Sequence, residues 1–145
     1  NNAYKQYLNF GKTERECIKA TIQLAQKAGY RDLQEIIKGK EPLKVGDKVY
    51  SVCMEKTIVL FQIGKENIET GLNILGAHID SPRIDVKQNP LYEAGEFAYL
   101  DTHYYGGIKK YQWVALPLAI HGVVVRKDGT KQEIVIGEKD EEQFL

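Results

Sequence analysis

The sequence is poor in the residues that define several specialised classes of protein. It has only two cysteines among 145 residues, Cys17 and Cys53, and their spacing matches neither a metal-binding pattern nor a disulfide framework. We expect both thiols to be free and buried, as in a protein of the reducing cytoplasm. The composition therefore argues against a small secreted protein stabilised by disulfides.

Long apolar runs and an excess of one charge are also missing. No stretch approaches the ~20 apolar residues needed to cross a bilayer, and the N-terminus has no signal-peptide pattern. Twenty Lys and Arg balance twenty Asp and Glu, so the formal net charge is zero. We expect no membrane partner and no nucleic-acid partner, although Lys109-Lys110 lies beside aromatic residues.

The first half of the chain has the pattern of an α/β protein. Residues 13–29 predict one helix, with a capping box of Thr13 and Glu16 at its start and Gly29 at its end. Residues 49–54 and 57–63 are rich in β-branched and aromatic side chains and predict a hairpin. Residues 72–77 predict a further, buried strand. The predicted fold is a mixed sheet with flanking helices.

Two polar residues follow the strand predicted at 72–77. His78 comes at its carboxyl end, where open α/β sheets usually place ligands, and Asp80 is two residues further on. A neutral imidazole binds zinc through one nitrogen when a carboxylate holds the other. The alternative is a hydrogen-bonded histidine beside an Asp-Ser-Pro turn, and spacing alone favours that alternative.

The character of the sequence changes after Lys87. Gln88-Asn89-Pro90 predicts a turn, near which we place a domain boundary, with one part at 1–88 and a second at 89–145. Residues 113–126 are typical of strands, and Asp128-Gly129 predicts a hairpin turn. The second part has no helix pattern, so we expect it to be the beginning of an all-β module.

Two longer segments carry a resemblance to a known family. GAHIDSPRIDVKQNPLYE at 76–93 and DTHYYGGIKKYQWVALPLAIHGVVVRKDG at 101–129 closely resemble the bacterial aspartyl aminopeptidases, which are co-catalytic zinc peptidases. AHIDSPR and YYGGIKKYQW are the most specific pieces, and the likeness runs from Thr13 to about Gly137. In that family the corresponding histidine is a zinc ligand and the aspartate supports the metal site. The resemblance thus implies that His78 binds metal and that Asp80 has a catalytic, supporting role.

The resemblance also implies an activity and an assembly. The family removes N-terminal residues, possibly acidic ones, from peptides with two Zn²⁺ ions per subunit; Mn²⁺ or Co²⁺ are possible substitutes. Its members are homo-oligomers, and a β-rich dimerisation domain is inserted into the catalytic α/β domain; residues 89–145 would be its start. The other ligands and the general base come later in the family's chains. We therefore expect this sequence, which does not begin with Met, to be an inactive piece of a longer polypeptide.

Other interpretations remain open at this point. The chain could be a non-catalytic assembly protein on the same scaffold, or a cysteine hydrolase that uses Cys53, although an apolar strand is a poor place to activate a thiol. His121, within an apolar run, predicts a histidine hydrogen-bonded to backbone, whereas His103 could line a pocket or an interface. For Arg83 we expect a structural ion pair.

Overall fold

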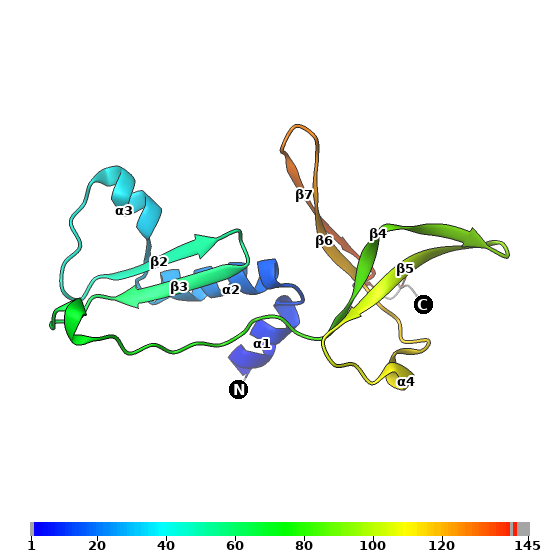
Figure 1. The fold of residues 1–145 in the computed structure, drawn as a ribbon, viewed down its shortest axis with the longest axis horizontal. Helices are drawn as coiled ribbons and strands as arrows, with labels where there is room; N and C mark the ends of the chain where they lie inside the picture. The colour runs from blue at the N-terminus through cyan, green and yellow to red at the C-terminus, as the bar shows by residue number, and fades with distance from the viewer. Residues whose placement is uncertain (1, 140, 142–145) are drawn as a thin grey trace. The chain divides into compact units, whose positions relative to one another are not determined.

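The computed structural model describes residues 2–139 and 141. The chain divides into two compact units, Asn1–Ile79 and Asp80–Leu145 (Figure 1). The division lies earlier in the chain than the boundary expected after residue 88. It falls between the two candidate site residues, because His78 belongs to the first unit and Asp80 to the second.

The first unit begins with two helices. Helix α1 spans Asn2–Phe10, and α2 spans Glu14–Lys27. The predicted capping box is confirmed: the backbone amide of Glu16 donates to the Thr13 hydroxyl, and the backbone amide of Thr13 donates to the Glu16 carboxylate at 2.9 Å. Both bonds satisfy amides that have no partner within the helix, so they fix where α2 starts.

A small sheet packs beside α2. Strand β1 is Arg31–Asp32, helix α3 is Leu33–Gly39, and β2 and β3 are Lys48–Cys53 and Thr57–Gln62. The sheet order is β1-β2-β3, with β1 parallel to β2 and β2 antiparallel to β3, and α2 lies across the β2–β3 hairpin (Figure 1). The hairpin prediction is confirmed. Every hydrophobic side chain that is buried among the described residues lies in this unit: Cys17, Ile18, Ala20, Ala25, Ile36, Val49 and Tyr50.

A long connection follows β3. It contains one short 3-10 helix, Ile68–Thr70, and then continues without helix or strand to Pro82. No helix among the described residues is both long enough and apolar enough to cross a membrane.

The second unit consists of two hairpins and one helical turn. Strands β4, Arg83–Ala94, and β5, Phe97–Tyr105, pair with each other; β6, Ile120–Val125, and β7, Lys131–Ile136, form the other hairpin. Between the hairpins lies the four-residue helix α4, Lys110–Trp113, where the sequence predicted none. The Asp-Gly turn between β6 and β7 is confirmed, since the Thr130 amide donates to Asp128 at 2.9 Å.

The prediction of a turn at Gln88-Asn89-Pro90 is wrong. These residues lie inside β4, where the register with β5 shifts between Val86 and Leu91 and produces an irregular bulge. The actual turn is Gly95-Glu96, whose φ angles are +55° and +67°. Two successive positive φ values match the right-handed twist of a two-residue hairpin, so this turn closes β4 on β5.

Candidate functional site

The stretch before His78 is not the buried strand that the sequence predicts. Residues 72–77 form no strand, and Ile74 and Leu75 are 80% and 101% exposed. A strand is stable only where a neighbour takes up its backbone hydrogen bonds. In the part of the chain that the structure describes, no strand pairs with this segment, which explains why an apolar sequence with a strand pattern remains extended and uncovered.

The end of this stretch is held against α2. The Cys17 sulfur lies 3.6 Å from each of two backbone carbonyl oxygens, those of Gly11 and Ile79, and its single proton can be donated to one of them at a time. Burial raises the pKa of the Cys17 thiol, so the proton that makes this contact is retained. The contact fixes the backbone directly after His78, whose own side chain is exposed.

Asp80 lies at the start of the second unit and is half-buried. The Tyr105 hydroxyl donates to Oδ2 of Asp80 at 2.9 Å. Tyr105 is the last residue of β5 and lies opposite Arg83, the first residue of β4. The register of the hairpin thus brings a phenol back to the loop that follows His78.

Arg83 holds both a carboxylate and an aromatic ring. Its Nε donates to Asp85 Oδ1 at 2.6 Å, which confirms the expected ion pair. Its guanidinium carbon also lies 4.2 Å from the centroid of the Tyr105 ring. A cation over an aromatic face is attracted by the electron-rich π system. Asp85, Arg83, Tyr105 and Asp80 therefore form one continuous chain of contacts.

Gly106 brings the end of β5 close to the same loop. Its φ is +75°, and a Cβ atom there would lie 3.4 Å from Cα of Pro82. The positive φ favours glycine at this position, whereas an added Cβ would make only ordinary van der Waals contact with Pro82. This packing and the Tyr105 hydrogen bond hold the Asp80–Pro82 loop from two sides.

Gly106→Ala should destabilise the protein by about 1–2 kcal/mol, because alanine is strained at positive φ. The free energy of unfolding, measured by urea titration, checks this. Gly107→Ala is the matched control, since its φ is not positive and a Cβ there would meet nothing within 4 Å. Equal losses for the two variants would contradict the assignment of strain to Gly106.

The two most specific sequence pieces are thus joined in space. Residues 80–83 of the first contact residues 105–106 of the second through the hydrogen bond, the ring contact and the Gly106–Pro82 packing. Sequence reasoning did not single out Tyr105, because it misplaced the hairpin turn. The sequence does contain a signal for the correct turn, because Gly95 and the polar Glu96 lie between two strand patterns. A hairpin turn at these two residues brings Tyr105 opposite Arg83.

The other two histidines lie in the second unit. His103, in β5, lines a hollow of about 590 Å³ at the bulge in β4, together with Val86, Lys87, Gln88 and Asn89. His121, in β6, has its Nε2 2.8 Å from Oε1 of Glu138, a carboxylate partner that the sequence did not predict. Such a pair is an ordinary way to satisfy a histidine in a hairpin.

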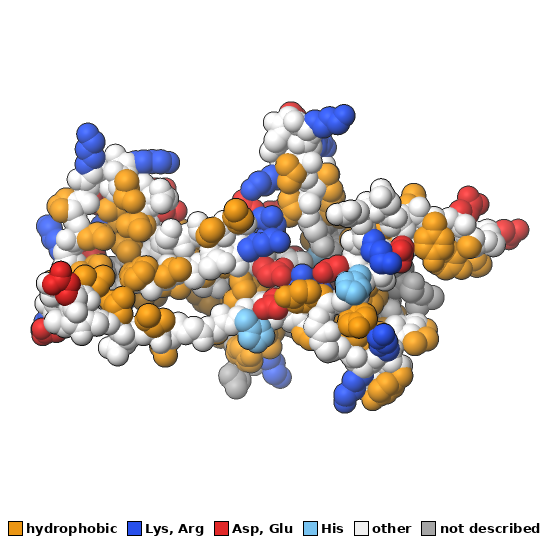
Figure 2. Space-filling model, viewed as in Figure 1, with side chains coloured by type: hydrophobic (Ala, Val, Ile, Leu, Met, Phe, Trp, Pro, Cys, Tyr) orange, Lys and Arg blue, Asp and Glu red, His pale blue; other side chains and the backbone are white. Residues whose placement is uncertain are grey.

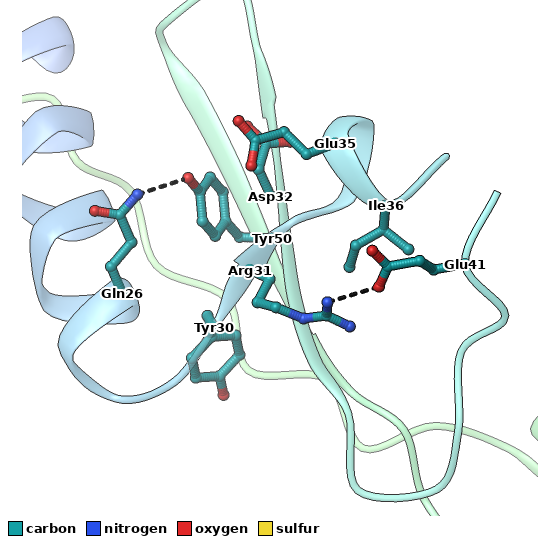
Figure 3. A pocket seen from close by; sticks show the side chains of 8 residues that line it. All are labelled: Gln26, Tyr30, Arg31, Asp32, Glu35, Ile36, Glu41 and Tyr50. Carbon is teal, nitrogen blue, oxygen red and sulfur yellow. Dashed lines mark hydrogen bonds and ion pairs between the residues drawn. The ribbon is translucent and has the colours of Figure 1, made fainter. Parts of the chain in front are cut away.

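A second hollow lies in the first unit between α2, α3 and β2 (Figure 3). It has a volume of about 310 Å³, and two pairs of its lining residues bond to each other: Gln26 donates to the Tyr50 hydroxyl at 3.1 Å, and Arg31 pairs with Glu41 at 2.8 Å. Neither hollow is lined by His78 or Asp80. Of the two candidate residues, His78 is exposed and Asp80 is half-buried.

Among residues 2–139 and 141, no three His, Cys, Asp or Glu side chains come together in a group that could hold a metal ion. The donors that the sequence analysis named are one imidazole and one carboxylate, both of a type that zinc accepts. The Tyr105 hydroxyl donates to Oδ2 of Asp80. The imidazole and the carboxylate alone fall short of the four ligands of a zinc site.

The two cysteines differ in accessibility. Cys17 is buried at 6% exposure, as predicted, but Cys53 is exposed at the end of β2, so the prediction of a buried thiol is wrong there. An alkylating reagent at pH 8 should modify Cys53 first, and Cys17 only in denaturant, because its thiol is shielded and its pKa is raised. Peptide mass spectrometry after timed labelling measures both rates, and equally fast labelling would contradict the burial of Cys17.

Comparison with known proteins identifies relatives over nearly the whole chain. The family described as aminopeptidase I zinc metalloprotease (M18) matches residues 7–143. A probable M18 family aminopeptidase 1 of Clostridium acetobutylicum is 58% identical over 137 residues, which are 94% of this chain and 30% of that protein. The chain therefore spans about 30% of the length of that curated relative.

Solved structures give the same result. The crystal structure of aminopeptidase I from Borrelia burgdorferi is similar to this chain with a TM-score of 0.85 and 42% sequence identity. The match covers 97% of this chain and 35% of the Borrelia chain. The crystal structure of an M18 family aminopeptidase from Thermotoga maritima matches with a TM-score of 0.85 and 41% sequence identity. This match covers 97% of this chain and 30% of the Thermotoga chain. The mixed α/β architecture predicted from the sequence agrees with these structures, and the chain belongs to the M18 family of aminopeptidase I zinc metalloproteases.

Proposed function

We propose that this chain is the N-terminal part of a metal-dependent aminopeptidase, with His78 as a zinc ligand and Asp80 as the carboxylate that supports it. The observation that carries the proposal is the junction of the two family-like segments directly after His78, where Tyr105 and Gly106 fix the Asp80–Pro82 loop. A ligand on an otherwise extended segment needs such support, because metal affinity depends on how well the donor is oriented beforehand.

The chemistry of the two residues is complementary. A carboxylate that accepts a hydrogen bond from one imidazole N–H leaves the other ring nitrogen unprotonated for a metal, and this is the support proposed for Asp80. When bound, zinc polarises the scissile carbonyl and lowers the pKa of a water molecule. Two protein donors fall short of the four or more that a zinc site requires, so the remaining ligands and the general base would come from outside residues 1–145.

The exposed surface supports a longer polypeptide. The chain exposes 12165 Å², whereas two separate folded units of this combined mass would expose roughly 9,100 Å². Hydrophobic side chains gather over the β2–β3 hairpin (Figure 2), where Val59, Leu60 and Phe61 are each at least 40% exposed. We propose that further parts of the protein cover these surfaces, and that residues 1–145 alone are inactive. Cleavage of an aminoacyl chromogenic substrate by the purified 145-residue chain would overturn this.

The finer properties of the family are also proposals for this protein. We propose that each subunit binds two metal ions, with Mn²⁺ or Co²⁺ as possible replacements for zinc, and that the enzyme prefers acidic N-terminal residues. We further propose a cytoplasmic location and homo-oligomers, which form through a dimerisation domain that begins in the second unit. The end of the β4–β5 hairpin, which presents an apolar cluster (Figure 2), is consistent with an assembly role for that unit: Leu91, Tyr92, Phe97 and Tyr99 are 72%, 51%, 68% and 42% exposed.

Metal content and peptidase activity of the longer protein test the proposed function. Plasma mass spectrometry should find close to two metals per chain, and the same samples should hydrolyse aminoacyl substrates, with aspartyl and leucyl compounds compared for preference. A protein that stays metal-free and inactive after reconstitution would favour the second candidate, a non-catalytic assembly protein on the same scaffold. Activity that is lost on alkylation of Cys53 would instead favour a cysteine hydrolase.

A further inference from the structure

The β4–β5 hairpin ends in a surface that is both apolar and acidic (Figure 2). We call the exposed side chains around its turn the hairpin tip: Leu91, Tyr92, Glu93, Glu96, Phe97 and Tyr99. The rings of Tyr92 and Tyr99 stack with their centroids 5.3 Å apart, which gives the apolar part a defined shape. Residues 91–99 include two carboxylates and no Lys or Arg. An apolar cluster with charges at its rim is typical of a protein-interaction surface.

A second exposed patch, of opposite charge, surrounds α4. We call it the α4 patch: Lys109, Lys110, Tyr111, Val114 and Leu116. Figure 2 shows basic side chains beside hydrophobic ones on this part of the second unit. Residues 109–116 include two lysines and no Asp or Glu. The hairpin tip and the α4 patch are therefore both apolar and complementary in charge, as the two sides of an interface are.

The two patches of one molecule lie at opposite ends of the hairpin. The α4 patch is held at its base, because Lys110 Nζ lies 4.6 Å from the ring centroid of Tyr104, which pairs with Ile84 near the start of β4. Phe97, at the tip, is seven residues from Tyr104 along β5, which corresponds to roughly 23 Å of extended strand. A paired hairpin does not fold back on itself over that distance, so the tip needs a different molecule's patch.

We propose that the hairpin tip of one copy docks on the α4 patch of a second copy, with Glu93 and Glu96 facing Lys109 and Lys110. The inference deepens the proposed homo-oligomer and rests on that part of the proposed function. Around a two-fold axis, each copy gives its tip and receives that of its partner, because the same surfaces of both subunits meet there. A specific interface buries about 1,200–2,000 Å² in total, and this exchange doubles the area that one tip contributes.

Charge reversal in the longer protein tests the contact. The tip variant combines Glu93→Lys with Glu96→Lys, and the α4 variant combines Lys109→Glu with Lys110→Glu. Each puts like charges opposite one another, so the protein concentration at which the assembly half-dissociates should rise about tenfold or more in sedimentation equilibrium. An equimolar mixture of the two variants has opposite charges at both contacts again. It should associate nearly as tightly as the wild type.

Lys44→Glu combined with Lys65→Glu is the matched control. Both lysines are exposed loop residues of the first unit, and the control changes the net charge as much as the α4 variant does. It should associate like the wild type. Mixed with the tip variant, it should leave that variant dissociated, although the two net charges are opposite. Association of the tip variant in this mixture as strong as with the α4 variant would mean that net charge alone drives assembly, and would overturn the inference.

The remaining outcomes also decide. Variants that assemble like the wild type would overturn the inference, as would two weakened variants that do not restore each other, a result expected if a later segment of the same polypeptide covers the tip. If a reversed variant does not fold, as judged by circular dichroism, Gln at the same two positions replaces it, and unchanged association then overturns the inference.

The same samples distinguish this contact from the enzymatic function. A monomeric wild type that binds zinc and hydrolyses aminoacyl substrates would overturn the contact alone. A wild type that assembles, and whose charge variants behave as expected, but that stays metal-free and inactive would overturn the peptidase function and leave the contact in place.

Discussion

Replacement of His78 by alanine in the longer protein should remove bound metal and aminopeptidase activity together. Loss of a group that merely supports a ligand typically costs 10–100-fold, so loss of the ligand itself should exceed about a hundredfold in kcat/KM. The side chain is exposed, so its truncation leaves no cavity in the core. The variant should therefore fold normally, which makes the loss a property of the site.

Metal content and activity are measured on the same samples of wild type and His78→Ala. His121→Ala is the matched control, since His121 has a carboxylate partner, Glu138, in the β6–β7 hairpin and should keep full metal content. A His78→Ala protein that retains both metal and activity would show that this histidine is structural. The alternative of a hydrogen-bonded histidine beside an Asp-Ser-Pro turn would then be correct.

Asp80→Asn should lower zinc affinity and kcat by about 10–100-fold. Asparagine has nearly the same shape, and its amide oxygen can still accept the Tyr105 hydroxyl, so the loop should stay in place. What disappears is the negative charge that gives Asp80 its proposed supporting role at the metal site. The variant thus isolates the electrostatic part of the support from the geometric part.

Zinc competition titration and steady-state kinetics measure this effect. Asp101→Asn provides the control within the same hairpin, because Asp101 pairs with Lys87 in a solvent-exposed ion pair whose loss should change neither quantity. Equal losses in the two variants would point to a general effect on the hairpin and would contradict a specific role for Asp80.

The parts of the fold that were predicted correctly depend on local contacts. The capping box at Thr13 requires only Glu16, and the turns of the β2–β3 and β6–β7 hairpins lie between adjacent strands. Hydrogen bonds across such short separations are specified by the sequence on either side of them. A short window of residues is therefore enough to predict these features.

The parts that were missed depend on distant partners. Residues 72–77 have a strand pattern, but a pattern does not provide the neighbouring strand, and the described chain does not contain one. The contact of Tyr105 with Asp80 requires the register of β4 on β5, which the bulge at residues 87–90 shifts. The sequence named His78 and Asp80 as a pair, whereas the residues that hold Asp80 became evident only from the pairing of these strands.

The uncovered state of residues 72–77 has a consequence for biosynthesis. Ile74 and Leu75 are 80% and 101% exposed, and β3 has β2 as its only partner strand among the described residues. An unpaired apolar segment beside an open strand edge is a template for pairing between nascent chains. The uncovered apolar segment and the free edge of β3 should therefore make residues 1–145, synthesised by themselves, prone to aggregation.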